Sequence, residues 1–147
     1  SGVHYCFVAR DSDMIVFEKL VNRDLNQRQL TNEAIQVIQS LESVPEPHRE
    51  RFSKSSLANL AGSASVDCHV LYDVVFIGLV TSTGYGAVAA QRFLIQMHEA
   101  VTTHYADNLV FIKGRESEAK RFDKKFAADF RRIYNHNDTG IKMGTIS

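Results

Sequence analysis

The residues that could support catalysis are scattered along the chain. Six histidines fall in segments with different predicted structures, at His4, His48, His69, His98, His104 and His136. His98 and His104 belong to one predicted helix, but their spacing of six does not bring two side chains together as a spacing of three or four does. We therefore expect no metal site.

Nucleophilic catalysis has no better candidate. Cys68 and His69 are adjacent in a predicted strand, where neighbouring side chains point to opposite faces of the sheet. No spacing groups a serine with a histidine and an acid. The sequence therefore predicts no catalytic residues and no enzyme activity.

The segment Thr83-Gly84-Tyr85-Gly86 follows a predicted strand and precedes a predicted helix, as phosphate-binding loops do. A Walker loop would require Gly-Lys-Ser/Thr, and a dinucleotide loop would require a third glycine. This segment runs instead into Ala87-Val88-Ala89-Ala90. It predicts a plain turn, and no cofactor is expected.

Composition limits the class of protein. The chain has 147 residues, 44% of them hydrophobic, which fits one domain with a packed core. Cys6 and Cys68 lie in apolar runs and are interpreted as reduced core residues, which favours the cytosolic side of a cell. No signal peptide and no apolar run of roughly 20 residues is visible, so no membrane span is expected. Residues 1–2 resemble the remnant of a cleaved tag.

Charge is balanced overall but not along the chain. Lys113 to Ser147 contains nine basic and five acidic residues. Nucleic acid or anionic lipid could bind such a segment, but the interleaved acids favour a solvated helix face. No nucleic-acid partner is predicted.

The elements begin with two strands, Val3 to Arg10 and Met14 to Leu20, joined at Asp11-Ser12-Asp13. A hairpin alone is marginal in water, so helices must cover it. The first helix shows an apolar stripe at Leu30, Ala34, Val37, Ile38 and Leu41. Either Asn26 or Thr31 could cap its start, and Val44-Pro45-Glu46-Pro47 ends it.

Three further segments complete the predicted sheet. Arg51 to Ser65 is either a short edge strand or a loop, and Val66 to Tyr72 is a strand. Val74 to Thr81 is apolar on both faces through Val80, which predicts a central strand between two layers of helices. Its Gly78 is expected to let a helix approach the backbone closely.

Two amphipathic helices follow the sheet. The first is predicted over Ala87 to Tyr105, followed by a separate short run, Leu109 to Ile112. The last helix has a buried stripe of apolar residues, comprising Ala119, Phe122, Phe126, Phe130 and Ile133.

This order of elements resembles the longin fold of membrane-trafficking proteins, over Val3 to about Tyr134. Three segments carry the resemblance. His4 to Arg10 resembles the first strand of longin-type R-SNAREs. Ala90 to His98 resembles their second helix. Arg121 to Phe126 resembles their closing helix, and Tyr134 to Asp138 resembles the exit from that helix. Ile141 to Ser147 is similar to the linker that leads into a SNARE helix in the ER-to-Golgi and vesicle-associated members.

The resemblance implies an α+β, profilin-like fold: a five-stranded antiparallel sheet with one helix on one face and two on the other. It implies a longin domain over 3–138, and over 139–147 the start of a linker toward a coiled-coil SNARE segment. The function implied is that of a non-catalytic, regulatory protein-binding domain of an R-SNARE in vesicle trafficking and membrane fusion. Its location would be the cytosolic face of ER, Golgi, endosomal or vesicle membranes.

The implied partners are the protein's own SNARE segment, other SNAREs, and coat or tether proteins. Membrane attachment would come only from a C-terminal anchor beyond residue 147. The implied binding groove lies between the first helix and the third strand and would contain Ile35, Gln39, Leu57 and Leu60. Ile35 and the two leucines could equally complete the core.

A second family remains open. Sedlin-type small subunits of vesicle-tethering (TRAPP) complexes share this fold, and their last helix also carries a phenylalanine-aspartate pair like Phe122-Asp123. Such subunits are scaffolds that carry no SNARE segment.

Overall fold

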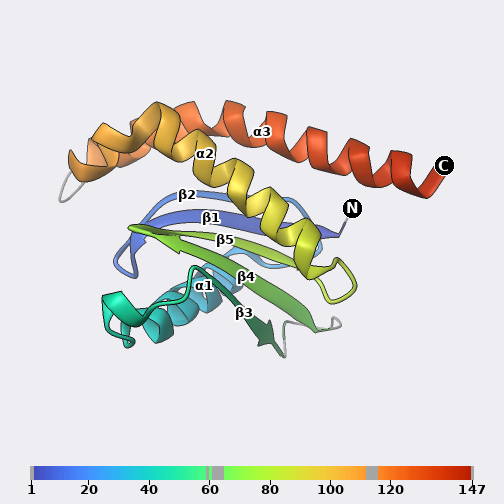
Figure 1. Cartoon of the computed structure of the whole chain (residues 1–147), viewed down its shortest axis with the longest axis horizontal. Helices are drawn as coiled ribbons and strands as arrows, with labels where there is room; N and C mark the ends of the chain where they lie inside the picture. Colours follow the sequence, from blue (N-terminus) through green and yellow to red (C-terminus); the bar gives the residue numbers. More distant parts are fainter. Residues whose placement is uncertain (1, 59, 61–64, 112–115, 147) are drawn as a thin grey trace.

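The computed structural model describes residues 2–58, 60, 65–111 and 116–146, and of these 104–111, 116–119 and 138–146 by their backbone alone. Five antiparallel strands form one sheet in the order β2-β1-β5-β4-β3 (Figure 1). The strands are β1 (Val3–Asp11), β2 (Met14–Leu20), β3 (Phe52–Leu57), β4 (Val66–Asp73) and β5 (Val75–Ser82). The predicted α+β class and five-stranded sheet are confirmed.

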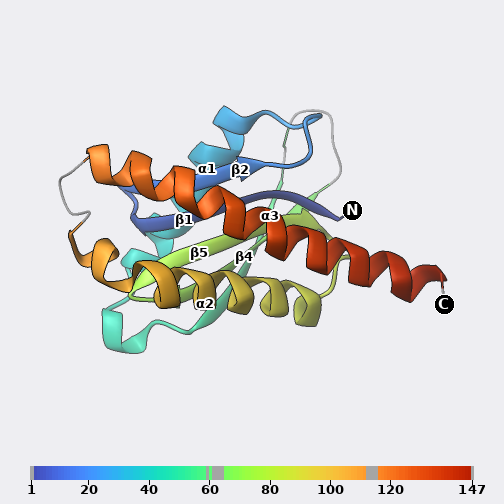
Figure 2. The same ribbon diagram turned by 90° about the horizontal axis from the view of Figure 1, so that it is seen from above.

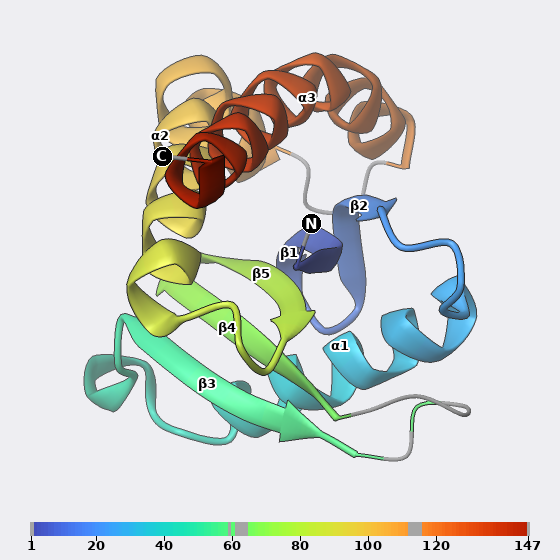
Figure 3. The same cartoon turned by 90° about the vertical axis from the view of Figure 1, so that its right-hand side faces the viewer.

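The helices cover both faces of this sheet. They are α1 (Gln27–Glu42), the short 3-10 helix η1 (Glu46–His48), α2 (Ala87–Phe111) and α3 (Glu116–Ile146). Figure 3 shows α1 on one face and α2 with α3 on the other, and the core is divided into two clusters accordingly. One helix on one face and two on the other is the predicted arrangement, consistent with a longin or profilin-like fold.

The central position of β5 is also confirmed, since it pairs with β1 on one side and β4 on the other. The role expected of Gly78 was wrong. A Cβ at Gly78 would lie 2.0 Å from Cε1 of Phe7, its cross-strand partner on β1. An aromatic ring of the neighbouring strand, not a helix, fills the space above this glycine.

The segment 51–65 contains an edge strand, β3, because it pairs only with β4 among the described residues. The tight β4–β5 connection is a single residue, Val74, with a φ of 65° and a side chain that is 76% exposed. Left-handed backbone is unusual for a β-branched residue. The hairpin therefore stores strain at its tip.

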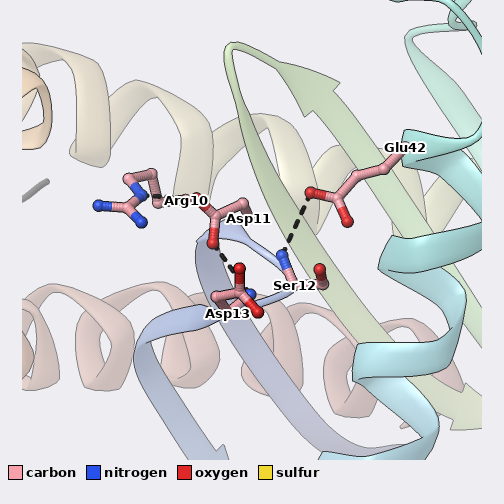
Figure 4. A network of polar contacts seen from close by, with 5 residues as sticks. All are labelled: Arg10, Asp11, Ser12, Asp13 and Glu42. Carbon is pink, nitrogen blue, oxygen red and sulfur yellow. Dashed lines mark hydrogen bonds and ion pairs between the residues drawn. The ribbon is translucent and has the colours of Figure 1, made fainter. Parts of the chain in front are cut away.

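Local signals position α1. The Asn26 side chain accepts a hydrogen bond from the Gln29 N–H (2.9 Å), so Asn26 is the N-cap of the helix. The helix ends before Pro45, as expected, with Ser43 as its C-cap. At the same end, Glu42 Oε2 accepts from the Ser12 N–H (3.3 Å) and ties the helix to the β1–β2 turn (Figure 4).

The two long helices extend further than expected. Leu109 to Phe111 belong to α2 rather than to a separate run, and Ile112 lies outside the described residues. The α3 backbone remains helical through Ile146, so no break marks the expected exit at Tyr134 to Asp138 or the boundary at 138. Figure 2 shows α3 running across the sheet and extending past its edge.

The phenylalanine stripe of α3 is part of the core, as predicted. Phe122, Phe126 and Phe130 are all buried. The ring of Phe17 on β2 packs edge-on against Phe126, with 4.8 Å between ring centroids. These aromatic contacts fix α3 against β2.

Candidate interaction surface

Within the described part of the chain, the residues with possible catalytic chemistry lie apart from one another. His69 bonds to Thr81 inside the sheet, His98 Nε2 lies 3.0 Å from Asp73 Oδ2 at the β4–β5 turn, and His4 contacts Asn22. His48 is in η1 and His136 on α3, both exposed, while the side chain of His104 lies outside the described part. Among the described residues, no three metal-ligating side chains come together.

The sheet itself separates the two cysteines. Cys6 is buried in the core cluster under α2 and α3, and Cys68 in the cluster under α1. Burial raises the pKa of both thiols, and that of Cys68 to about 12. Thiols held in the protonated form are weak nucleophiles. The segment 83–86 is a turn between β5 and α2, as predicted.

The four residues expected to line a partner groove occupy three different environments. Leu57 and Leu60 are 6% and 3% exposed and belong to the cluster that joins α1 to the sheet. Gln39 is exposed and Ile35 is half-buried. Of the two alternatives left open for Leu57, the structure favours the core: the side chain turns inward at the end of β3 and belongs to the cluster under α1.

Ile35 faces away from β3. Residues four and seven positions away share its side of α1. These are Thr31, whose hydroxyl donates to Glu18 Oε1 on β2 (2.6 Å), and Glu42, which accepts from the β1–β2 turn (3.3 Å). Ile35 therefore lies toward the β1–β2 hairpin, and the structure does not bring it together with Leu57 and Leu60.

The edge of β3 offers a different binding feature: outward backbone groups. The Tyr72 N–H donates to the Arg51 carbonyl (2.7 Å), which sets the alternation of hydrogen bonds along the β3–β4 pair. By that alternation, Phe52, Lys54 and Ser56 direct their N–H and C=O groups away from β4. An edge of this kind can accept an added strand.

A polar cluster missed by sequence reasoning supports this edge from one side. Asp67 is 4% exposed and contacts two residues of β3, with its Oδ2 3.5 Å from Lys54 Nζ and its Oδ1 accepting from the Ser56 hydroxyl (3.3 Å). His69 lies two positions further along β4 and pairs across from Lys54. Asp67 and His69 alternate with apolar residues within one strand, and that period of two could have revealed the cluster.

His69 is held neutral in this cluster. The Thr81 hydroxyl donates to the Ser82 carbonyl (3.0 Å), so the contact between His69 Nε2 and Thr81 Oγ1 (3.1 Å) requires the imidazole to donate from Nε2. Burial lowers the pKa of His69, and the charge of Lys54 lowers it further, against the opposing effect of Asp67.

The other edge of the sheet, β2, is partly closed by α3. The side chain of Asp123 on α3 lies beside Glu18 of β2 at this edge, and burial raises the pKa of Asp123. The Val21 N–H donates to the His4 carbonyl, and the alternation from that bond turns the Glu18 N–H outward. Of the Phe122-Asp123 pair, the ring of Phe122 is buried in the core and Asp123 lies over the β2 edge.

No protein-family model matches the sequence, and no curated protein is significantly similar to it. Within the part of the chain that the structure describes, no helix is long and apolar enough to cross a bilayer.

Proposed function

We propose that this chain is a non-catalytic, regulatory protein-binding domain of a longin-type R-SNARE that acts in vesicle trafficking and membrane fusion on the cytosolic face of a membrane. The observation that carries the proposal is the open edge of β3, with the outward backbone groups of Phe52, Lys54 and Ser56. It is supported by the fold and by the resemblance of the strand and helix segments described above.

Binding at this edge proceeds by strand addition. An extended peptide forms main-chain hydrogen bonds with β3, and its alternate side chains lie over the two faces of the sheet. On the face covered by α1, buried Leu57 and Leu60 hold the end of β3 against the helix and do not themselves contact the partner. The segments that fit are the protein's own SNARE segment, other SNAREs, and peptides of coat or tether proteins.

The decisive variant is Lys54→Pro. Proline lacks the outward N–H, yet at this position it removes no bond to β4, so the sheet is retained. Lys54→Ala is the matched control, because it removes the same side chain and its contact with Asp67 but keeps the backbone donor.

The assay is an array of synthetic peptides that covers the SNARE segments, coat proteins and tether proteins of the source cell, probed with the labelled domain. Some peptides should bind the wild type and Lys54→Ala with similar affinity, and Lys54→Pro at least tenfold more weakly, the loss of about 1.4 kcal/mol. Binding that persists in Lys54→Pro would exclude this edge, and the absence of any binding peptide would contradict the proposed function.

A further inference from the structure

A recess lies at the β2 edge of the sheet, between β2 and α3, on the opposite side of the sheet from the β3 edge. Its volume is about 240 Å³, enough for one large apolar side chain. Buried Phe17 and Phe130 form its floor, and half-buried Val21 and Tyr134 form part of its walls. We call it the β2–α3 groove.

The rim of the groove carries one sign of charge. Nine residues line it, all in the described part of the chain, and they include three cations, Lys19, Arg23 and Arg131, and no acid. The wider groove between α2 and α3, of about 500 Å³, is lined by Glu99 as well as Arg132 and therefore selects no sign. A rim of one sign attracts an opposite charge and orients it during encounter.

Backbone groups add a third component. The alternation that turns the Glu18 N–H outward also turns the N–H and C=O of Leu20 outward, and Leu20 lines the groove. One step earlier on the same edge, Asp123 of α3 lies beside Glu18.

We infer that the β2–α3 groove binds an extended acidic segment of a partner protein through a single apolar anchor. The anchor is a leucine or phenylalanine that packs on Phe17 and Phe130, and flanking acids pair with Lys19, Arg23 and Arg131. The floor is recessed between a strand and a helix, so a chain segment reaches it and a flat bilayer surface does not. The site is distinct from the β3 edge and does not depend on the function proposed there.

Two exposed neighbours on α3 give a sharp steric test. Ala127 lines the groove, whereas Ala128 is also exposed but does not line it. Ala127→Trp fills the groove, and Ala128→Trp places the same ring on the same helix outside it. The charge of the rim is tested with a double variant that combines Arg23→Glu and Arg131→Glu. Its control is a double variant that combines Lys124→Glu and Lys125→Glu, because both lysines are exposed on α3.

The probe is a fluorescein-labelled heptapeptide with a central phenylalanine and three Asp or Glu residues on each side, measured by fluorescence anisotropy with the 147-residue chain. Ala127→Trp and the Arg23/Arg131 double variant should weaken binding at least tenfold, and the two controls less than about twofold. A peptide with alanine in place of phenylalanine should bind about tenfold more weakly, and the affinity should fall between 50 and 300 mM salt.

Other results overturn the inference. Equal loss in Ala128→Trp or in the lysine double variant means that the contact is non-specific. Binding to phosphatidylserine vesicles but not to the peptide identifies a membrane surface as the occupant. Self-association that Ala127→Trp abolishes identifies a second copy. Lys54→Pro should leave peptide binding unchanged, so failure here and failure at the β3 edge are separate results.

Discussion

The ring of Phe7 lies where a side chain of Gly78 would begin. The two residues are cross-strand partners on β1 and β5, and an added Cβ would lie 2.0 Å from Cε1 and 2.1 Å from Cζ of that ring. The ring is fully buried in the cluster under α1 and has no room to withdraw. The centre of the sheet thus depends on the smallest residue paired with one of the largest.

Gly78→Ala should therefore lower the free energy of unfolding by about 3 kcal/mol, at the upper end of the usual effect of overpacking. Gly84→Ala is the control, since a Cβ at Gly84 would meet no atom within 4 Å. Urea unfolding of both variants measures the difference. Adding Phe7→Leu to Gly78→Ala should recover part of the loss, and an equal effect of both glycine variants would contradict the assigned contact.

Phe126→Ala should cost roughly 3 to 5 kcal/mol, because it empties a fully buried aromatic site beneath α3. Lys124→Ala, an exposed change on the same helix, should stay within about 0.5 kcal/mol. Chemical denaturation followed by near-ultraviolet circular dichroism reports both. A loss below about 1 kcal/mol for Phe126→Ala would mean that α3 is not docked on the sheet.

The two apolar residues once expected in one groove should respond differently to charge. Leu57→Asp buries an unpaired carboxylate and should cost at least about 3 kcal/mol, enough to unfold a marginal domain. Ile35→Asp alters a half-buried side chain and should cost about 1 kcal/mol. Thermal unfolding of the two single variants separates them, and similar melting temperatures would show that Leu57 is not a core residue.

Two exposed valines predict opposite signs of stability change. Val74 is strained by its φ of 65°, so Val74→Gly should raise the free energy of unfolding by about 1 kcal/mol. Val88 is similarly exposed, at 72% against 76% for Val74, but lies in α2. Val88→Gly should therefore lower the free energy of unfolding by a few tenths of a kcal/mol. Urea midpoints give the comparison, and a destabilised Val74→Gly would show that the tip is relaxed.

His69 should make stability depend on pH. Burial lowers its folded pKa, so the unfolded chain takes up the proton first, and stability is lost as the pH falls through 6.5, the ordinary value for histidine. His69→Gln keeps a donor to Thr81 and should flatten this loss between pH 7 and 5. Burial also lowers the pKa of His4, so His4→Gln provides the comparison. An unchanged pH profile in His69→Gln would show that His69 is protonated without cost.

Periodicity explains what the sequence could predict. The two-sided apolar run of β5 fixes its central position, the stripe ending at Leu41 fixes the face that α1 buries, and Phe122, Phe126 and Phe130 fix the docking of α3. Each of these signals lies within one element. Such a pattern determines which residues of an element are buried, whichever neighbouring element covers them.

What escaped prediction depends on pairs of elements. The contact of Phe7 with Gly78 follows from the β1–β5 register, and the side on which Ile35 lies follows from the bonds of Thr31 and Glu42 to the hairpin. The β2–α3 groove joins Lys19 to Arg131, from opposite ends of the chain. Register and helix rotation are set by packing, and no local spacing encodes them.

The two edges of the sheet limit how copies of this chain can associate. On β2, α3 covers part of the edge and places Asp123 beside Glu18, so that edge admits a short segment beside Leu20 but no full strand. In the part of the chain that the structure describes, the β3 edge is the one available for a whole strand. With only one such edge per copy, strand pairing between copies closes after a two-fold pair and cannot propagate into a fibre.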